Sequence, residues 1–142
     1  MFIQWRWIQG YHINTGGVLF GGKLLSWVDE DCTMCACVQS PPNNNYTSAG
    51  MDRIKFIHPI YRGDRLQFCY SIVHVGSSSV TIRVKVYSFN TSKMIFSAYT
   101  TVVRVDENKN PVKIDFDLVI EDAKEEQFVE YLRSERKTHN EP

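Results

Sequence analysis

The sequence has no excess of charge of either sign, because sixteen Lys and Arg residues are balanced by sixteen Asp and Glu residues. A chain without a net positive field has no long-range attraction for a nucleic-acid backbone or an anionic membrane surface. No apolar run is long enough to span a bilayer, and the first residues lack the basic start and continuous apolar stretch of a signal peptide. We therefore expect a soluble, cytoplasmic protein whose partners include neither nucleic acid nor membrane.

Cysteine is scarce, with four residues in a chain of 142. Cys32, Cys35 and Cys37 lie close together in a predicted helix and Cys69 is far along the chain, which favours reduced thiols over disulfides. A helix separates successive side chains by about 100°, and no nearby His completes a set of four ligands, so core packing is favoured over a metal site. A chain of this length can bury a core without disulfides or metals.

Hydrophobic periodicity predicts one strand, one long helix and then four more strands. Period-2 alternation indicates a strand over 2–8, and apolar spacing after a glycine-rich stretch indicates a helix over 23–38. The four further strands are predicted over 48–58, 65–75, 79–90 and 93–105. Short connections with turn residues at 62–64, 76–78 and 90–92 favour antiparallel neighbours. This order predicts an α+β fold, an antiparallel five-stranded sheet wrapped around a long central helix.

The end of the chain differs in character from the rest. Apolar residues spaced among Glu and Lys predict a solvent-facing peripheral helix over 118–136. The sheet of five strands leaves exposed edges, and dimerisation is a natural way to cover them.

The glycines before the predicted helix suggest two kinds of site. Gly17 and Gly22-Lys23 fit most of a P-loop, but Leu24 replaces the hydroxyl that binds magnesium and no buried parallel strand precedes the loop. Gly21 and Gly22 instead let a ligand approach the free N–H groups of the first helical turn, which favour negative charge. A carbonyl placed there is stabilised as it becomes an oxyanion. The alternative role of the glycines is tight backbone packing.

Asp29 is the candidate base or nucleophile. It follows Gly22 by seven residues, which returns to nearly the same helix face roughly 10 Å along the axis. We expect Asp29 on the apolar side of a buried helix, where an acid is costly unless it is paired or used. Its alternative role is a hydrogen-bonded core carboxylate. Thr33, one turn beyond, would hold an attacking water or simply bond its own backbone.

Several motifs together resemble the acyl-CoA hydrolase branch of the hotdog thioesterases. They are Asn14-x-x-Gly17-x-x-Phe20-Gly21-Gly22, Trp27-x-Asp29-Glu30, Asp52-Arg53-Ile54-x-Phe56, Pro59-Ile60-x-x-Gly63-Asp64, Val75-Gly76-Ser77-Ser78-Ser79 and Val103-x-Val105-Asp106. The resemblance covers nearly all of residues 2–113. It implies a hotdog domain over 1–113, and the remainder, 114–142, is then a C-terminal helical extension.

The resemblance also implies an activity and an assembly. In that family two subunits build each active site, and larger assemblies, often hexamers, are common. The family's catalytic acid maps onto Asp29, its asparagine from the facing subunit onto Asn14, and its helix-start amides onto Gly22 with Gly21 beside it. The implied reaction is hydrolysis of acyl-CoA to a carboxylic acid and coenzyme A, by water activated at Asp29 or by attack of Asp29 itself through an anhydride. We expect a homodimer as the minimal active unit and a trimer of dimers as the larger assembly.

The sequence indicates less clearly which residues contact the substrate. No cofactor is expected, since coenzyme A is part of the substrate. Relatives often place an arginine or another polar residue just after the pair matched by Val75-Gly76 to contact the CoA phosphates, and this chain has Ser77 and then Ser78. The candidate CoA-binding residues are Gly21, Gly22, Ser77, Ser78 and Arg53. By charge alone, Arg62, Arg65, Lys85 or residues of a neighbouring subunit are further candidates for holding the phosphates. Asn14 would orient the water or the carbonyl, its alternative role being that of a turn-forming asparagine.

Two other functions fit the same fold. A hotdog hydratase or dehydratase is disfavoured because the hydratase-like Asp-x-Asn-x-x-His arrangement has His12 at its first position and Gly17 at its last. A non-catalytic acyl-CoA sensor or scaffold would keep the groove without turnover. The presence of both Asn14 and Asp29 favours the enzyme.

Overall fold

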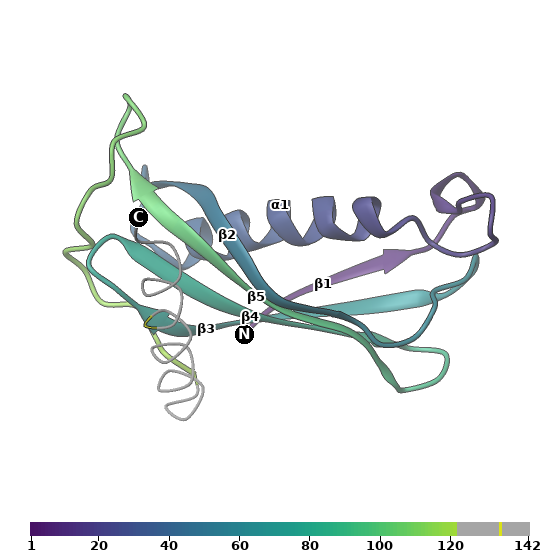
Figure 1. Ribbon diagram of the computed structural model, residues 1–142. Helices are drawn as coiled ribbons and strands as arrows, with labels where there is room; N and C mark the ends of the chain where they lie inside the picture. The colour runs from purple at the N-terminus through teal and green to yellow at the C-terminus, as the bar shows by residue number, and fades with distance from the viewer. Residues whose placement is uncertain (122–133, 135–142) are drawn as a thin grey trace.

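A computed structural model describes residues 1–121 and residue 134 of the chain. The elements are β1 (Phe2–Trp7), a short 3₁₀ helix η1 (Gly10–His12), α1 (Gly21–Gln39), β2 (Asn45–Phe56), β3 (Arg65–Val75), β4 (Ser79–Ser88) and β5 (Met94–Val105). The five strands form one antiparallel sheet in the order β1-β3-β4-β5-β2. The sheet curves around α1, which lies along one of its faces (Figure 1). The expected hotdog fold is confirmed.

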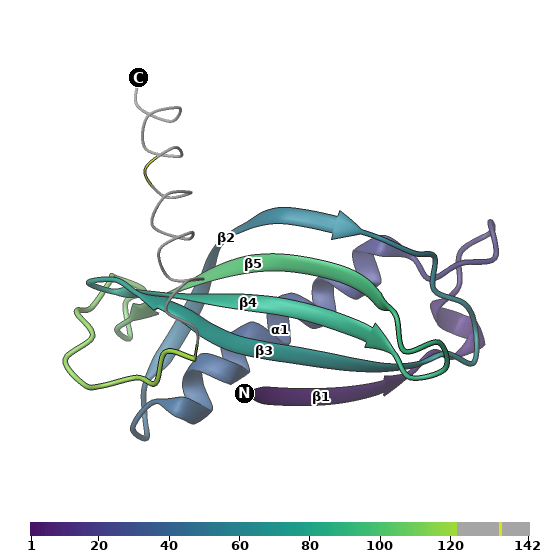
Figure 2. The same cartoon turned by 90° about the horizontal axis from the view of Figure 1, so that it is seen from below.

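Strict alternation fixes which face of the sheet meets the helix. In β4, Ile82, Val84 and Val86 are fully buried, whereas Arg83 and Lys85 between them are only half-buried. Successive side chains of a strand point to opposite faces, so the apolar set packs under α1 and the cations lie on the outer face. Figure 2 shows the sheet from this outer side, with α1 behind the strands.

The buried residues of α1 recur every three or four positions, as expected for one face of a helix. This face consists of Leu24, Trp27, Val28, Asp31, Cys32, Cys35 and Ala36. Each fully buried apolar side chain of this kind contributes roughly 1.5–3 kcal/mol relative to exposure. The helix ends at Gln39, just before Ser40 and Pro41, since the residue before a proline disfavours helical backbone.

The expected pairing of the second and third predicted strands is wrong. The turn at 62–64 was expected to join antiparallel neighbours, but β2 pairs with β5, and β3 pairs with β1 and β4. The whole connection from 57 to 64 is long enough to carry the chain across the sheet, which a tight hairpin turn cannot do.

The start of the predicted C-terminal helix is also wrong, whereas residue 134, within the predicted range, is helical. Residues 118–121 are not helical, and the rest of the predicted range, apart from residue 134, lies outside the described residues. Residues 111–120 alternate between exposed and half-buried, and Ile114, Leu118 and Ile120 pack against the core. Period-2 burial therefore replaces the expected helical period where that segment begins.

Within the described residues, no helix is both long and apolar enough to cross a membrane.

Candidate functional site

The start of α1 offers unpaired backbone donors. Phe20 precedes the helix and no side chain caps it, and the N–H groups of Gly21 and Gly22 have no acceptor among the described residues. A Cβ on Gly22 would lie 2.7 Å from Cε1 of Phe20, so the glycine leaves room for that ring. Two free N–H groups at the positive end of the helix dipole can stabilise a developing oxyanion.

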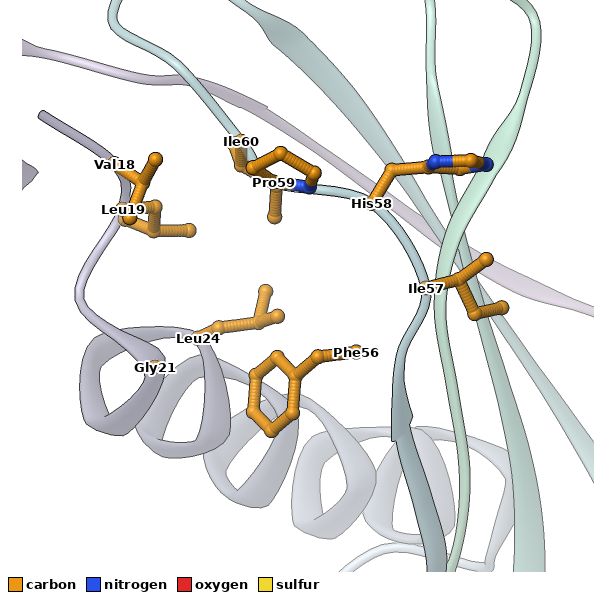
Figure 3. Close-up of a pocket in the computed structure, with 9 residues that line it drawn as sticks. All are labelled: Val18, Leu19, Gly21, Leu24, Phe56, Ile57, His58, Pro59 and Ile60. Carbon is orange, nitrogen blue, oxygen red and sulfur yellow. The ribbon is translucent and has the colours of Figure 1, made fainter.

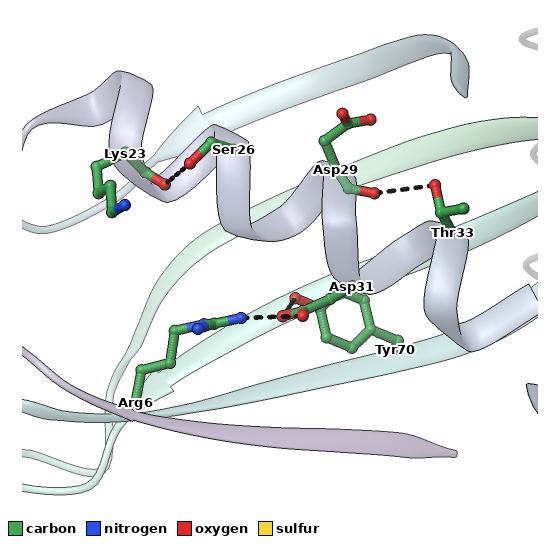
Figure 4. A network of polar contacts seen from close by, with 7 residues as sticks. All are labelled: Arg6, Lys23, Ser26, Asp29, Asp31, Thr33 and Tyr70. Atoms are coloured by element: carbon green, nitrogen blue, oxygen red, sulfur yellow. Dashed lines mark hydrogen bonds and ion pairs between the residues drawn. The ribbon is translucent and has the colours of Figure 1, made fainter. Parts of the chain in front are cut away.

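Asp29 is exposed, contrary to the expectation that it lies on the apolar side of the helix. The buried positions of α1 include Val28 but not its neighbour, since one helical step turns the side chain by about 100°. The Asp29 carboxylate points away from the buried face (Figure 4). Ser48 of β2 donates a hydrogen bond to its Oδ1. The carboxylate is therefore accessible and oriented by a hydroxyl from a neighbouring element.

Thr33 and Asn14 each make the local contact named as the alternative to a catalytic role. The Thr33 hydroxyl donates to the Asp29 carbonyl oxygen at 3.2 Å. The Asn14 side-chain oxygen accepts from the N–H groups of Gly16 at 2.9 Å and Val18 at 3.2 Å, which closes the loop before α1. No hydrogen bond joins Asn14 to Asp29 within the described part of one chain. A shared site would need Asn14 from another subunit.

His12 holds the loop that carries Asn14. Its Nδ1 accepts the Gln9 N–H at 3.0 Å, and its ring packs edge-on against Trp27 with the centroids 4.9 Å apart. Burial, followed by the positive charges of Lys23 and Arg6, lowers the pKa of His12. The neutral ring is the form that this contact requires, because Nδ1 accepts a hydrogen bond only when it carries no proton.

An apolar cavity lies beside the first turn of α1. Its volume is about 310 Å³, and its lining includes Val18, Leu19, Leu24, Phe56 and Ile60. Leu24 and the Phe56 ring point into it, whereas His58 points away (Figure 3). An apolar group bound here would lie next to the free N–H groups of Gly21 and Gly22.

The buried acid of α1 is Asp31, which sequence reasoning missed. Only 3% of Asp31 is exposed. Arg6 of β1 lies 3.0 Å from its Oδ1, and the Tyr70 hydroxyl donates to its Oδ2 at 2.6 Å (Figure 4). Burial raises the pKa of Asp31 against the opposing effects of Tyr70 and Arg6. The signal in the sequence was the spacing of Asp31 from Leu24, Trp27 and Val28.

The candidate CoA contacts are not brought together within one chain. Arg53 lies on β2 near the Asp52–Tyr99 pair, whereas Ser77 and Ser78 form the β3–β4 turn beside Val103. At about 3.4 Å per residue, four strand positions separate them by roughly 14 Å along the sheet. The Ser77 and Ser78 carbonyls accept the N–H groups of Ile114 and Arg104. Any common ligand would have to span this distance or bind at a subunit interface.

The four cysteines are free thiols. Burial raises the pKa of all four, that of Cys35 to about 12. Thiols held in the protonated form are poor nucleophiles and poor metal ligands, which favours a packing role.

Comparison with known proteins identifies the family. The model of the thioesterase superfamily matches residues 16–95, which include the start of α1, Asp29 and Ser48. The chain belongs to the thioesterase superfamily. A Bacillus subtilis protein named as an uncharacterized acyl-CoA thioester hydrolase is 29% identical to this chain over 105 residues. The match covers 71% of this chain and 60% of that protein. The Helicobacter pylori protein VdlD is 30% identical over 100 residues, 68% of this chain and 56% of its own. The chain thus spans about 60% of these relatives.

Solved structures agree with the thioesterase fold. An apo hexameric acyl-CoA thioesterase matches with a TM-score of 0.80 and 25% identity, covering 96% of this chain and 88% of that one. An acyl-CoA hydrolase from Staphylococcus aureus, solved with butyryl coenzyme A, matches with a TM-score of 0.79 over 96% of this chain and 83% of that one. At 24% identity, this second likeness bears on the fold alone.

Proposed function

We propose that this thioesterase-superfamily chain hydrolyses acyl-CoA to a free carboxylic acid and coenzyme A. The observation that carries the proposal is the accessible Asp29 carboxylate, which Ser48 of β2 orients. Asp29 lies on α1, and the first turn of this helix presents the unpaired Gly21 and Gly22 N–H groups. A carboxylate and an oxyanion-stabilising pair are the two components that acyl transfer to water requires.

In the proposed reaction, the thioester carbonyl oxygen accepts hydrogen bonds from Gly22 and Gly21 of the facing subunit, because about 10 Å of helix separates these amides from Asp29 within one chain. Asp29 takes a proton from water, which attacks the carbonyl carbon, and collapse of the tetrahedral intermediate expels the CoA thiolate. In the other route Asp29 attacks the carbonyl carbon directly and expels the CoA thiolate, forming a mixed anhydride that water hydrolyses to the carboxylic acid and free Asp29. Asn14 from a second subunit orients the water or carbonyl, and Thr33 assists if its hydroxyl leaves the Asp29 carbonyl. The apolar cavity beside Gly21 suits an acyl chain.

We further propose that the minimal active unit is a homodimer and that three dimers form a hexamer. Asn14 and Asp29 make no hydrogen bond with each other in the described part of one chain, and in this proposal a second copy supplies the Asn14 that acts with Asp29. An acyl-CoA thioesterase of the same fold is hexameric. In this proposal residues 1–113 form the catalytic domain, residues 114–142 are an extension, and Arg53, Ser77 and Ser78 contact CoA across a subunit interface.

The second candidate is an acyl-CoA sensor that binds without turnover. The observation that favours it is the engagement of the Asn14 and Thr33 side chains in local contacts. The two functions differ in one measurable product, free coenzyme A.

The decisive experiment incubates the purified protein with short-, medium- and long-chain acyl-CoAs and follows thiol release. We expect hydrolysis, with a preference among chain lengths that reflects the apolar cavity. Binding of acyl-CoA without thiol release across the whole panel would reject hydrolysis in favour of the sensor.

A further inference from the structure

Positive charge is concentrated in the sheet. The five strands contain seven Lys and Arg residues and a single acidic residue, Asp52. The whole chain, by contrast, carries sixteen residues of each sign. The sheet is therefore basic, although the net charge of the whole chain is zero.

Four of these cations form one group, the outer-face cluster of Arg53, Lys55, Arg83 and Lys85. They line a shallow hollow of about 170 Å³ together with Ser97 and Tyr99. Lys85 and Lys55 both pair with Ser97, so they lie on either side of the same β5 residue. Neighbouring strands are about 4.8 Å apart, which places the two lysine backbones roughly 10 Å from each other.

The cluster lies on the face of the sheet opposite α1, the face seen in Figure 2. Val84, between Arg83 and Lys85, is fully buried against the helix side, so both cations project outward. The positive charges of Arg83 and Lys85 also reach Cys69 on the outer face of β3, where they oppose the effect of burial on that thiol.

A β-bulge brings the β2 cations onto this face. Asp52 pairs with Tyr99 and Lys55 with Ser97, so β2 has one more residue than β5 in this interval. Without the extra residue, Asp52 and Lys55 would point to opposite faces. Arg53, within the bulge, has a φ of 48°, which is uncommon for a residue other than glycine. The backbone thus departs from regular strand geometry where it adds positive charge to the hollow.

The strand positions around the hollow carry these four cations and one acid, Asp52. If solubility were the role, interspersed charges of both signs would serve it. Guanidinium groups bind phosphate oxygens through paired N–H donors, and hydroxyls such as those of Ser97 and Tyr99 can add further donors. We propose that the outer-face cluster is a binding site for the phosphate or pyrophosphate group of a phosphorylated small molecule.

The cluster shares Arg53 with the proposed CoA contacts, but it lies on the opposite side of the sheet from α1 and Asp29 within one chain. It is tested with inorganic pyrophosphate by isothermal titration calorimetry at low salt, without any acyl-CoA. We expect saturable binding that weakens as salt is added, since exposed charges are screened. Binding should be unchanged in Asp29→Asn, which keeps this test independent of hydrolysis.

Variants identify the residues. Arg83→Gln with Lys85→Gln should weaken pyrophosphate binding roughly tenfold, and Lys55→Gln alone should weaken it to a smaller extent. The matched control is Lys93→Gln, an exposed lysine in the β4–β5 turn outside the hollow, which should bind as the original protein does. Thermal melts establish that each variant is folded. Absence of binding, or equal weakening by Lys93→Gln and Lys55→Gln, would overturn the proposal.

Competition distinguishes two sources of the same chemistry. If coenzyme A displaces pyrophosphate from the original protein and dephospho-coenzyme A does so less well, the cluster holds the 3′-phosphate of CoA. If coenzyme A binds without displacing pyrophosphate, the cluster serves a separate phosphorylated molecule. Both results require the pyrophosphate binding that the charge variants test.

Discussion

Asp29 and Asp31 are the same residue type, two positions apart on α1, in opposite surroundings. Asp29 is exposed and receives a hydrogen bond from Ser48. Asp31 is buried, with Arg6 and Tyr70 on its two oxygens. Both oxygens of its carboxylate are engaged, and only 3% of the residue is exposed. The comparison teaches that a paired, buried acid stabilises the helix position, while the accessible one is left for chemistry.

The largest effect should come from removing the charge of Asp29. In Asp29→Asn we expect kcat to fall by about 10³-fold, a typical loss for a general base or nucleophile, with the fold intact. The matched control is Glu30→Gln, the adjacent exposed acid, which should keep nearly full activity. Thiol release at saturating acyl-CoA measures both. Equal activity of Asp29→Asn and the original protein would show that exposure alone does not mark the catalytic acid.

The next effect concerns stability rather than turnover. Arg6→Leu leaves the Asp31 carboxylate buried without its cation, which should lower the free energy of unfolding by about 3 kcal/mol. Restoring neutrality with Asp31→Asn in the Arg6→Leu background should recover part of that loss. Urea unfolding of the two variants checks the prediction. If Asp31→Asn lowers the free energy of unfolding further, the hydrogen bond from Tyr70 to the carboxylate contributes more than the buried unpaired charge costs.

Ser48 should have a smaller effect, confined to the exposed acid. Ser48→Ala removes the hydroxyl that donates to Asp29, and we expect kcat to fall roughly tenfold, the worth of one hydrogen bond to a charged group. Thr47→Ala, the exposed neighbour on β2, is the control and should change little. If both variants retain full turnover, Ser48 does not position the carboxylate.

The smallest effect is a dependence of stability on pH through His12. The fold lowers the pKa of His12 from its ordinary value of 6.5, so the neutral ring adds stability at neutral pH that is lost as the pH falls below that value. Between about pH 7.5 and about pH 5 we therefore expect the free energy of unfolding to fall. His12→Gln should flatten the curve over this interval. Asp31, whose pKa is raised, acts with the opposite sign and is present in both proteins.

The sequence predicted where the helix and strands lie better than it predicted which of their side chains are buried. Residues 65–75 form β3 as predicted, since turn residues bound that strand on both sides. The burial of Asp29 was predicted wrongly because its apolar neighbour Val28 was taken as a guide, whereas a count from Leu24 places Asp31 in the buried row. Arg6 is half-buried between exposed Trp5 and Trp7, an inversion that hydrophobicity alone does not predict. Arg6 is turned inward because its guanidinium pairs with the buried Asp31 carboxylate.

Other parts of the candidate site depend on contacts distant in sequence. Ser48 meets Asp29 only because β2 runs beside α1, and the order of strands that places it there was mispredicted at the β2–β3 connection. The roles of Asn14, Arg53, Ser77 and Ser78 depend on a second copy of the chain, and for them the sequence offers a resemblance rather than a geometry.

The basic sheet gives the molecule an electric dipole although its net charge is zero. The strands carry seven cations and one acid, whereas the other described residues carry five cations and nine acids. Such a molecule presents opposite poles to its surroundings and turns as it approaches a charged body, before any contact forms. In practice, the protein should be retained at low salt by cation and anion exchangers alike, even near its isoelectric point of about 6.9.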